Sequence, residues 1–190
     1  LKALSYDRTF SIFHKLPHEY AQFAWFGLEL AKLPGASTWA EKTLQGVTVD
    51  VITEGQYTAT IGLNCSVFVP MGGVNVTLLG VLANGEPIET IRNIDYAMSE
   101  VQADLYTLKV NNDKVPFNDN GIALEENTLR GTLARMETEG VFIPGATTVT
   151  APKFSEVSSA DIAARILRMS FNARIQNAIV KTAITGTVTL

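Results

Sequence analysis

PIETIRNIDYAMSEVQADLYTLK, residues 87–109, is the stretch that decides how this chain folds. Its apolar residues recur at steps of three and four, which is the spacing of one face of an α-helix, and charged or polar residues occupy other positions on the helical wheel. That apolar face consists of Ile91, Ile94, Met98, Val101, Leu105 and Leu108. The pattern predicts a long amphipathic helix directly after Pro87.

Two further helices are predicted later in the chain. Asp119 is suited to cap a helix that runs to about Glu139, because a carboxylate can accept backbone N–H groups at a helix start. A shorter helix extends through Leu167, with Ser158 or Ser159 as its cap and Asp161 in its first turn. Residues 147–151 predict a strand between these helices, and the pattern from residue 169 to the end is again typical of strands.

Strands and short helices are also predicted before the long helix. The β-prone residues 9–13 indicate a short strand. An amphipathic helix is expected next, with an apolar side formed by Tyr20, Phe23, Ala24, Gly27, Leu28 and Ala31. Residues 47–51 alternate between valine and polar residues and are compatible with another strand. Thr53 and Gln56 match a capping box, which predicts a short helix through Leu63.

Residues 65–69 and 74–82 are two apolar, β-rich runs separated by Pro70-Met71-Gly72-Gly73, so they predict a hairpin or a strand pair with a looser loop. Together these elements predict an α+β (mixed α/β) fold, in which a β-sheet packs against two or three helices. A chain of 190 residues suits one globular domain, or a domain with a small appendage.

Composition excludes several classes of function. A net charge of −4 offers no basic field for nucleic acid. The most apolar stretch near the start, residues 20–33, is interrupted by polar residues and is too short to span a bilayer. One cysteine cannot form an internal disulfide, which excludes a disulfide-rich secreted scaffold. Because the chain begins with Leu1, we expect it to be part of a longer protein.

The residue types used in catalysis are few and scattered. His14 and His18 have a helical metal-ligand spacing, but Pro17 lies between them, so a strand-end histidine and a helix-start histidine are the better interpretation. Cys65 has apolar neighbours and fits a small core residue better than a nucleophile. The acidic pairs Glu125/Glu126 and Glu137/Glu139 fit a solvated helix face better than acid–base catalysis. The sequence predicts no catalytic, cofactor or metal site.

The end of the chain is more informative. Apolar residues and threonines alternate up to the last residue, and no charge follows Lys181. A strand of this kind needs a pairing partner. It either closes the sheet of its own chain or adds to the sheet edge of a neighbouring subunit, which would make the protein part of a polymer.

Several short segments, in their order and spacing, resemble the sheath proteins of phage contractile tails. The resemblance runs from about Tyr6 to Leu190. It rests on Arg8-Thr9, Pro34-Gly35-Ala36-Ser37-Thr38-Trp39 with Lys42, Leu44 and Gly46-Val47, Gly80-Val81-Leu82-Ala83-Asn84-Gly85-Glu86, Asp95-Tyr96, Lys114-Val115-Pro116-Phe117, Gly121-Ile122-Ala123, Ala163-Ala164-Arg165, Asn177-Ala178-Ile179 and Ile184-Thr185-Gly186-Thr187-Val188.

The resemblance implies a structural, non-catalytic subunit located in the virion tail and, during assembly, in the host cytoplasm. Such subunits form hexameric rings around a tail tube above a baseplate, and terminal arms add strands to neighbouring sheets. The chain looks like the carboxy-terminal portion of such a protein, without its amino-terminal arm. Residues 182–190 would be the strand-exchange arm and the subunit interface: Thr182, Ala183, Ile184, Thr185, Gly186, Thr187, Val188, Thr189 and Leu190.

The resemblance also suggests a role for the short helix at residues 159–167. Arg165, together with Arg168 just beyond it, would face the tube or another subunit. Direct contact with nucleic acid or membrane is not expected, nor is any cofactor. Two alternatives stay open: a small hydrolase that uses His14, His18 or Cys65, and a tail-tube or baseplate component of the same kind of particle.

Overall fold

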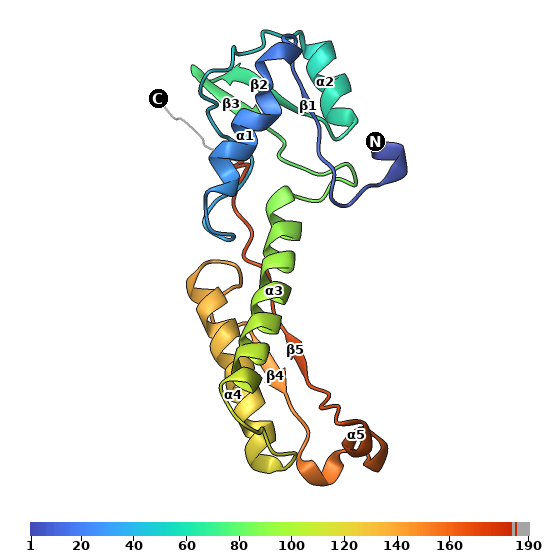
Figure 1. The fold of residues 1–190 in the computed structure, drawn as a ribbon. Coiled ribbons are helices and arrows are strands. Elements are labelled where there is room, and N and C mark those ends of the chain that lie inside the picture. The colour runs from blue at the N-terminus through green and yellow to red at the C-terminus, as the bar shows by residue number, and fades with distance from the viewer. Residues whose placement is uncertain (184, 186–190) are drawn as a thin grey trace. The chain divides into compact units, whose positions relative to one another are not determined.

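A computed structural model describes residues 1–183 and residue 185 (Figure 1). The chain forms two compact units. The first contains Leu1–Lys32, Ser37–Ile91 and the chain from Asn177 onward, and the second contains Leu33–Ala36 and Arg92–Gln176. Helix α3, Ile88–Val110, begins in the first unit and continues in the second. The fold is mixed α/β, as the sequence predicts.

The first unit is built on a three-stranded sheet with the order β1-β2-β3. Strand β1 (Ile12–Phe13) runs parallel to β2 (Ser66–Met71), and β2 forms an antiparallel hairpin with β3 (Val74–Leu78). Gly72 and Gly73 make the turn, with φ angles of 58° and 83°. A two-residue hairpin turn of this kind needs positive φ at both positions, which glycine adopts at little cost. Helices η1 (Lys2–Leu4), η2 (Pro17–Glu19), α1 (Ala21–Leu30) and α2 (Glu54–Gly62) complete the unit.

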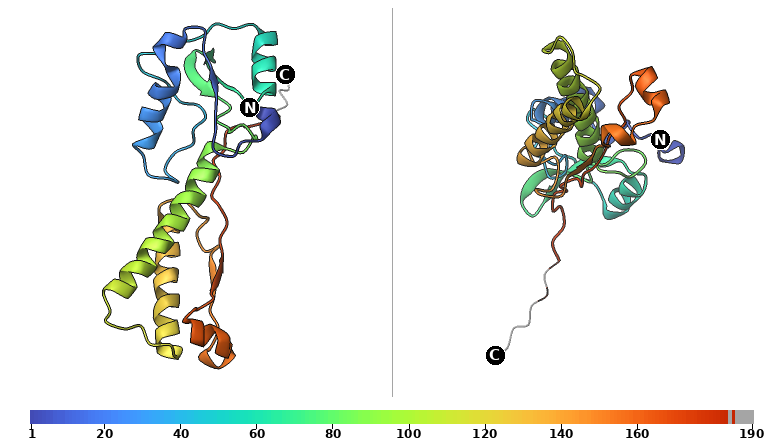
Figure 2. Two further views of the ribbon diagram at one scale, coloured as in Figure 1. Left: turned by 45° about the vertical axis from the view of Figure 1, so that its right-hand side comes forward. Right: turned by 90° about the horizontal axis from the view of Figure 1, so that it is seen from below.

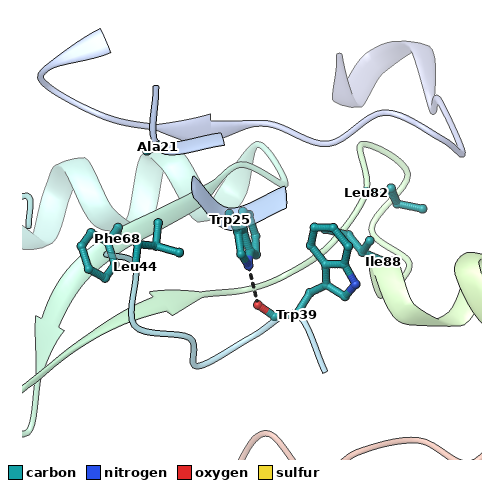
Figure 3. Packing of buried hydrophobic residues seen from close by; sticks show 7 residues of the cluster. All are labelled: Ala21, Trp25, Trp39, Leu44, Phe68, Leu82 and Ile88. Atoms are coloured by element: carbon teal, nitrogen blue, oxygen red, sulfur yellow. Dashed lines mark hydrogen bonds between the residues drawn. The ribbon is translucent and has the colours of Figure 1, made fainter. Parts of the chain in front are cut away.

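The core of the first unit is rich in aromatic rings. Trp25 of α1 and Trp39 of the following loop are buried, and the indole Nε1 of Trp25 donates a hydrogen bond to the Trp39 carbonyl at 3.1 Å (Figure 3). The ring of Phe10 lies edge-on to that of Trp25, with centroids 5.4 Å apart. Phe68 brings the central strand into the same cluster. Four consecutive residues of β2 are buried, as expected for a strand covered on both faces.

The second unit is built on two long helices. Helix α4, Asp119–Thr138, runs beside α3 in all the views that show both (Figures 1 and 2). Ala97 of α3 belongs to the same buried cluster as Leu129 and Leu133 of α4. Beside them lies a two-stranded antiparallel sheet of β4 (Thr148–Thr150) and β5 (Ser170–Asn172). The connection between these strands contains η3 (Phe154–Glu156) and α5 (Ser159–Ala164).

One arginine joins α3 to α4. The guanidinium of Arg135 lies 2.9 Å from Glu100, 2.9 Å from Asp104 and 3.6 Å from Glu139. Asp104 also accepts a hydrogen bond from the hydroxyl of Thr132 at 2.6 Å. That hydroxyl, and then the Arg135 guanidinium, hold the pKa of Asp104 below its ordinary value.

Several predicted elements are confirmed at close to their expected positions. The long helix after Pro87, the helix that ends near Glu139, and the hairpin all form. The capping box is present as well, because Thr53 accepts from the backbone of Gln56 while the Gln56 side chain accepts from the backbone of Thr53.

Other predictions were wrong in detail. Residues 47–51 form no strand; their one backbone link to the sheet is the bond from Asp50 N–H to Phe68 O. The cap of α4 is Asn118 rather than Asp119, since the Asn118 side chain accepts from Gly121 N–H. Helix α5 ends at Ala164 instead of Leu167 because Arg165 turns left-handed.

The buried side of α1 matches the prediction only in part, since Ala24 and Leu28 pack against the core as expected. Ala21, Trp25 and Glu29 face the core, whereas Tyr20 and Phe23 are exposed. This helix is apolar around most of its circumference, so periodicity alone does not decide which side is buried.

Candidate functional site

His14 is enclosed between two carboxylates at the end of β1, with a side chain only 5% exposed. Its Nδ1 lies 3.0 Å from Asp50 Oδ2, and its Nε2 lies 3.3 Å from Glu19 Oε2. Each ring nitrogen therefore has a carboxylate oxygen within hydrogen-bonding distance, and the imidazole bridges Asp50 and Glu19.

The two carboxylates have further partners in the same unit. Asp50 accepts from Lys15 N–H at 3.1 and 3.2 Å. Glu19 accepts from the backbone N–H of Thr48 and from its hydroxyl, and these bonds, the backbone one first, hold the pKa of Glu19 below its ordinary value. The cluster therefore fastens residues 14–19 to residues 48–50, and its polar atoms are already used in doing so.

The other residues considered for catalysis do not join this cluster. His18 lies on the exposed turn η2. Cys65 is half-buried, and its thiol contacts the Ser66 carbonyl at 3.7 Å. Among residues 1–183 and 185, no group of three His, Cys, Asp or Glu side chains is arranged to hold a metal ion. The structure brings His14, but neither His18 nor Cys65, together with acidic groups.

The acidic residues of α4 have structural partners instead of forming a solvated face. Glu125 is buried and lies 3.4 Å from the Lys109 ammonium, which corrects the expectation of an exposed carboxylate. Glu137 accepts from Gly145 N–H and from the backbone and hydroxyl of Thr147, and these bonds, led by that from Gly145, lower its pKa. Glu139 accepts from the hydroxyl of Tyr96 at 2.9 Å. These carboxylates hold the fold of the second unit.

The two edges of the three-stranded sheet differ in whether their backbone N–H and C=O groups have hydrogen-bond partners. The outer edge of β3 is covered, since Glu41 N–H donates to Thr77 O and Thr77 N–H donates to Lys42 O. At the other edge, Ser66 N–H donates to Ser11 O, and Ile12 stands opposite Ser66 in a parallel register. Peptide groups alternate in direction along a strand, so those of Ile12 point away from β2. Within the described residues they have no backbone partner.

Helix α1 presents a second apolar surface to solvent. Tyr20, Phe23 and Leu30 are 56%, 65% and 53% exposed, and Gly27 lies between them at helical spacing. The sequence contained this signal, because the steps from residue 20 to 23, 27 and 30 are three, four and three. We call these four residues the α1 stripe. Exposed apolar groups at helical spacing are typical of surfaces that contact another chain.

The predicted interface residues have the following positions. Thr182, Ala183 and Thr185 belong to no helix or strand, and the remainder of the predicted arm, residue 184 and residues 186–190, lies outside the described residues. Arg168 pairs with Asp161 at 3.1 Å. Arg165 is exposed and ends α5. No helix of the described chain combines the length and apolar character needed to cross a membrane.

The fold is similar to that of solved components of contractile particles. A chain in the helical sheath of the anti-feeding prophage, in its contracted state, matches with a TM-score of 0.66 and 12% identity, over 95% of this chain and 54% of that one. A chain in the baseplate of the same particle matches with a TM-score of 0.66 and 13% identity, over 87% and 48%. The contracted sheath complex of an extracellular contractile injection system, PVC, gives a TM-score of 0.55 and 14% identity, over 80% and 46%.

These matches establish a shared fold. The chain spans about half the length of the solved chains that it resembles. No protein-family model and no curated protein matches the sequence.

Proposed function

We propose that this chain is part of a structural subunit of a phage contractile tail sheath, which polymerises around the tail tube and contracts to drive the tube into the host envelope. The observation that carries the proposal is the match to a helical sheath over 95% of the chain. Its partners would be copies of itself in hexameric rings, the tail tube protein and the baseplate. The protein would occupy the virion tail, and the host cytoplasm while the tail assembles.

The role would be non-catalytic. The polar clusters of both units are consumed by structural contacts: His14 lies between Asp50 and Glu19, and Glu137 binds the loop after α4. A hydrolase would need a nucleophile and a base within hydrogen-bonding reach of each other. No hydrogen bond joins Cys65 to either histidine in the part of the chain that the structure describes.

Two surfaces of the first unit would link subunits. Residues 182–190 of one copy would add to the sheet of the next, and the outward peptide groups of Ile12 are the acceptor that we propose, because the β3 edge is already covered. The α1 stripe would contact a second copy as well. Four residues offer much less than the roughly 800 Å² per partner that a stable pair needs. A contact of that size suits a lattice, where many weak contacts act together.

A baseplate component is the second candidate, because two of the similar solved chains come from baseplate structures. A sheath subunit would form long tubes of stacked rings. A baseplate component would form one ring or remain unassembled without its partners. Particle length therefore separates the two roles.

Negative-stain electron microscopy of the protein expressed from its complete natural coding sequence tests the proposal. Tubes of stacked rings are expected. Monodisperse protein under all conditions tested would contradict the sheath role.

Deletion of residues 183–190 should abolish these tubes while the far-ultraviolet circular dichroism of the protein stays unchanged. Phe23→Ser in the α1 stripe should weaken assembly, whereas Tyr106→Ser, on an exposed position of α3, serves as the matched control. Normal tubes from the truncated protein would refute the strand-exchange part alone.

A further inference from the structure

The second unit contains a cavity of about 660 Å³. It lies where the end of α3, the loop at residues 112–117, the start of α4 and the segment around α5 come together. This volume is within the usual range of ligand pockets, roughly 300 to 1,000 Å³. The cavity plays no part in the contacts proposed above for the first unit.

The walls of the cavity combine apolar side chains with a few charged ones. The apolar part consists of Val115, Pro116, Phe117, Ile122, Ile162 and Leu167. The charged part is almost as large and consists of Lys109, Asp113, Lys114, Glu125 and Arg165, so charged groups of a ligand would find partners beside apolar walls.

The charges of the cavity are unevenly matched. Three basic and two acidic side chains line it, which leaves a net charge of +1. Lys109 and Glu125 form an ion pair with each other at 3.4 Å. Lys114 and Arg165 make no ion pair with any residue that the structure describes, and Asp113 is the one further acidic side chain of the lining. The cavity is therefore suited to a ligand that brings a negative charge.

Arg165 also has an unfavourable backbone conformation. Its φ angle is 58°, in the left-handed region, and its N–H closes the end of α5 by donating to Asp161 O and Ile162 O. Glycine is the usual residue at such a helix end, and a side chain there costs energy. The left-handed turn fixes the place at which the Arg165 side chain leaves the end of α5.

We propose that this cavity binds an acidic peptide segment of a partner chain. A carboxylate of the segment would pair with Arg165, whose guanidinium can donate two parallel hydrogen bonds, and with the Lys114 ammonium. An apolar side chain next to that carboxylate would enter the space lined by Phe117 and Ile162. The site lies within one chain, so it can be tested on unassembled protein.

The test is a titration of the ¹⁵N-labelled protein with the peptide acetyl-Gly-Asp-Leu-Phe-Glu-Gly-amide, followed by NMR. The control peptide carries Asn and Gln in place of Asp and Glu. Saturable shifts of the signals of Arg165 and of its neighbours in the cavity are expected with the acidic peptide, with at least tenfold weaker binding of the neutral one. An increase in sodium chloride from 50 to 500 mM should weaken the acidic peptide further.

Arg165→Gly separates binding from folding. It removes the cation and relieves the left-handed strain, so the melting temperature should rise while binding of the acidic peptide falls at least tenfold. Arg168→Gln, which removes a cation outside the cavity lining, should leave binding within twofold. Any of three outcomes would overturn the proposal. These are equal binding of both peptides, equal binding of the acidic peptide by wild type and Arg165→Gly, and the absence of NMR shifts at millimolar acidic peptide.

Discussion

Gly121→Ala should destabilise the second unit, whereas Gly131→Ala on the same helix should stabilise it. A Cβ atom at position 121 would lie 1.8 Å from the carbonyl oxygen of Pro116, and a Cβ at 131 meets nothing within 4 Å. Both substitutions favour the helix by up to about 1 kcal/mol, because alanine has the higher helix propensity. The difference between them therefore isolates the contact with the backbone of Pro116.

The cost at position 121 can be estimated from what must move. Pro116 O accepts from Asn118 N–H, and the Asn118 side chain caps α4 through Gly121 N–H. Displacing that loop would cost about 1 kcal/mol for the cap and about 1 to 3 kcal/mol for the crowding. After the gain in propensity, Gly121→Ala should lose about 2 kcal/mol and Gly131→Ala should gain about 1 kcal/mol.

Guanidinium denaturation followed by far-ultraviolet circular dichroism measures this difference. Both tryptophans, Trp25 and Trp39, lie in the first unit, so their fluorescence reports that unit separately. We expect Gly121→Ala to shift the dichroism midpoint downward. A Gly121→Ala protein as stable as Gly131→Ala would refute the contact between Pro116 and α4.

Three further predictions follow from the same structure. Gly35→Ala should also destabilise the second unit, by about 2 kcal/mol or more in the same denaturation assay. Gly35 has a φ of 84°, and a Cβ atom there would lie 2.7 Å from the backbone of Gly140 and Val141. An unchanged midpoint would contradict this packing. His14→Leu should cost about 3 kcal/mol, because buried Asp50 loses its imidazole partner and keeps only the Lys15 N–H. His18→Leu at an exposed position should change the tryptophan-monitored stability by less than about 0.5 kcal/mol, and equal effects would contradict a stabilising role of the contacts around His14. The lowered pKa of Glu137 contributes stability that is fully present above its ordinary value of 4.5 and is lost as the pH falls through the lowered pKa in the folded state. Urea midpoints at pH 7 and pH 3 should therefore differ less for Glu137→Gln than for wild type, and parallel losses would show that Glu137 carries no such contribution.

The elements that could be predicted from the sequence are those whose signals are local. Helix α3 has a continuous three- and four-residue pattern, and the hairpin has two glycines at its turn, so neither depends on distant residues. The division into two units has no comparable signal, because α3 runs through the boundary without a break. Residues 47–51 alternate like a strand, but only one backbone hydrogen bond, from Asp50 N–H to Phe68 O, joins them to the sheet. The side chain of Asp50 contacts His14 instead, and the sequence pattern does not reveal this contact.

Most of the candidate site depends on contacts between distant parts of the chain. The sequence identified Arg165 through a resemblance, but the cavity beside it needs Lys114 and Phe117 from a loop about fifty residues earlier. Ala24 and Leu28 of the apolar side predicted for α1 pack against the core, whereas Tyr20, Phe23 and Gly27 are exposed. The centre of the core is taken by Trp25, which lies on another side of the helix. The burial of Glu125 needs Lys109 of another helix, which spacing along α4 does not reveal.

The three carboxylates around Arg135 have a mechanical consequence. Sliding α4 along α3 by one helical turn would move the guanidinium by about 5.4 Å. Because Glu100 and Asp104 are one turn apart on α3, such a shift would leave the guanidinium beside only one of them, and it would carry the buried cluster that contains Ala97 and Leu129 out of register. Sliding of α4 along α3 is therefore opposed both by the loss of an ion pair and by the loss of buried packing.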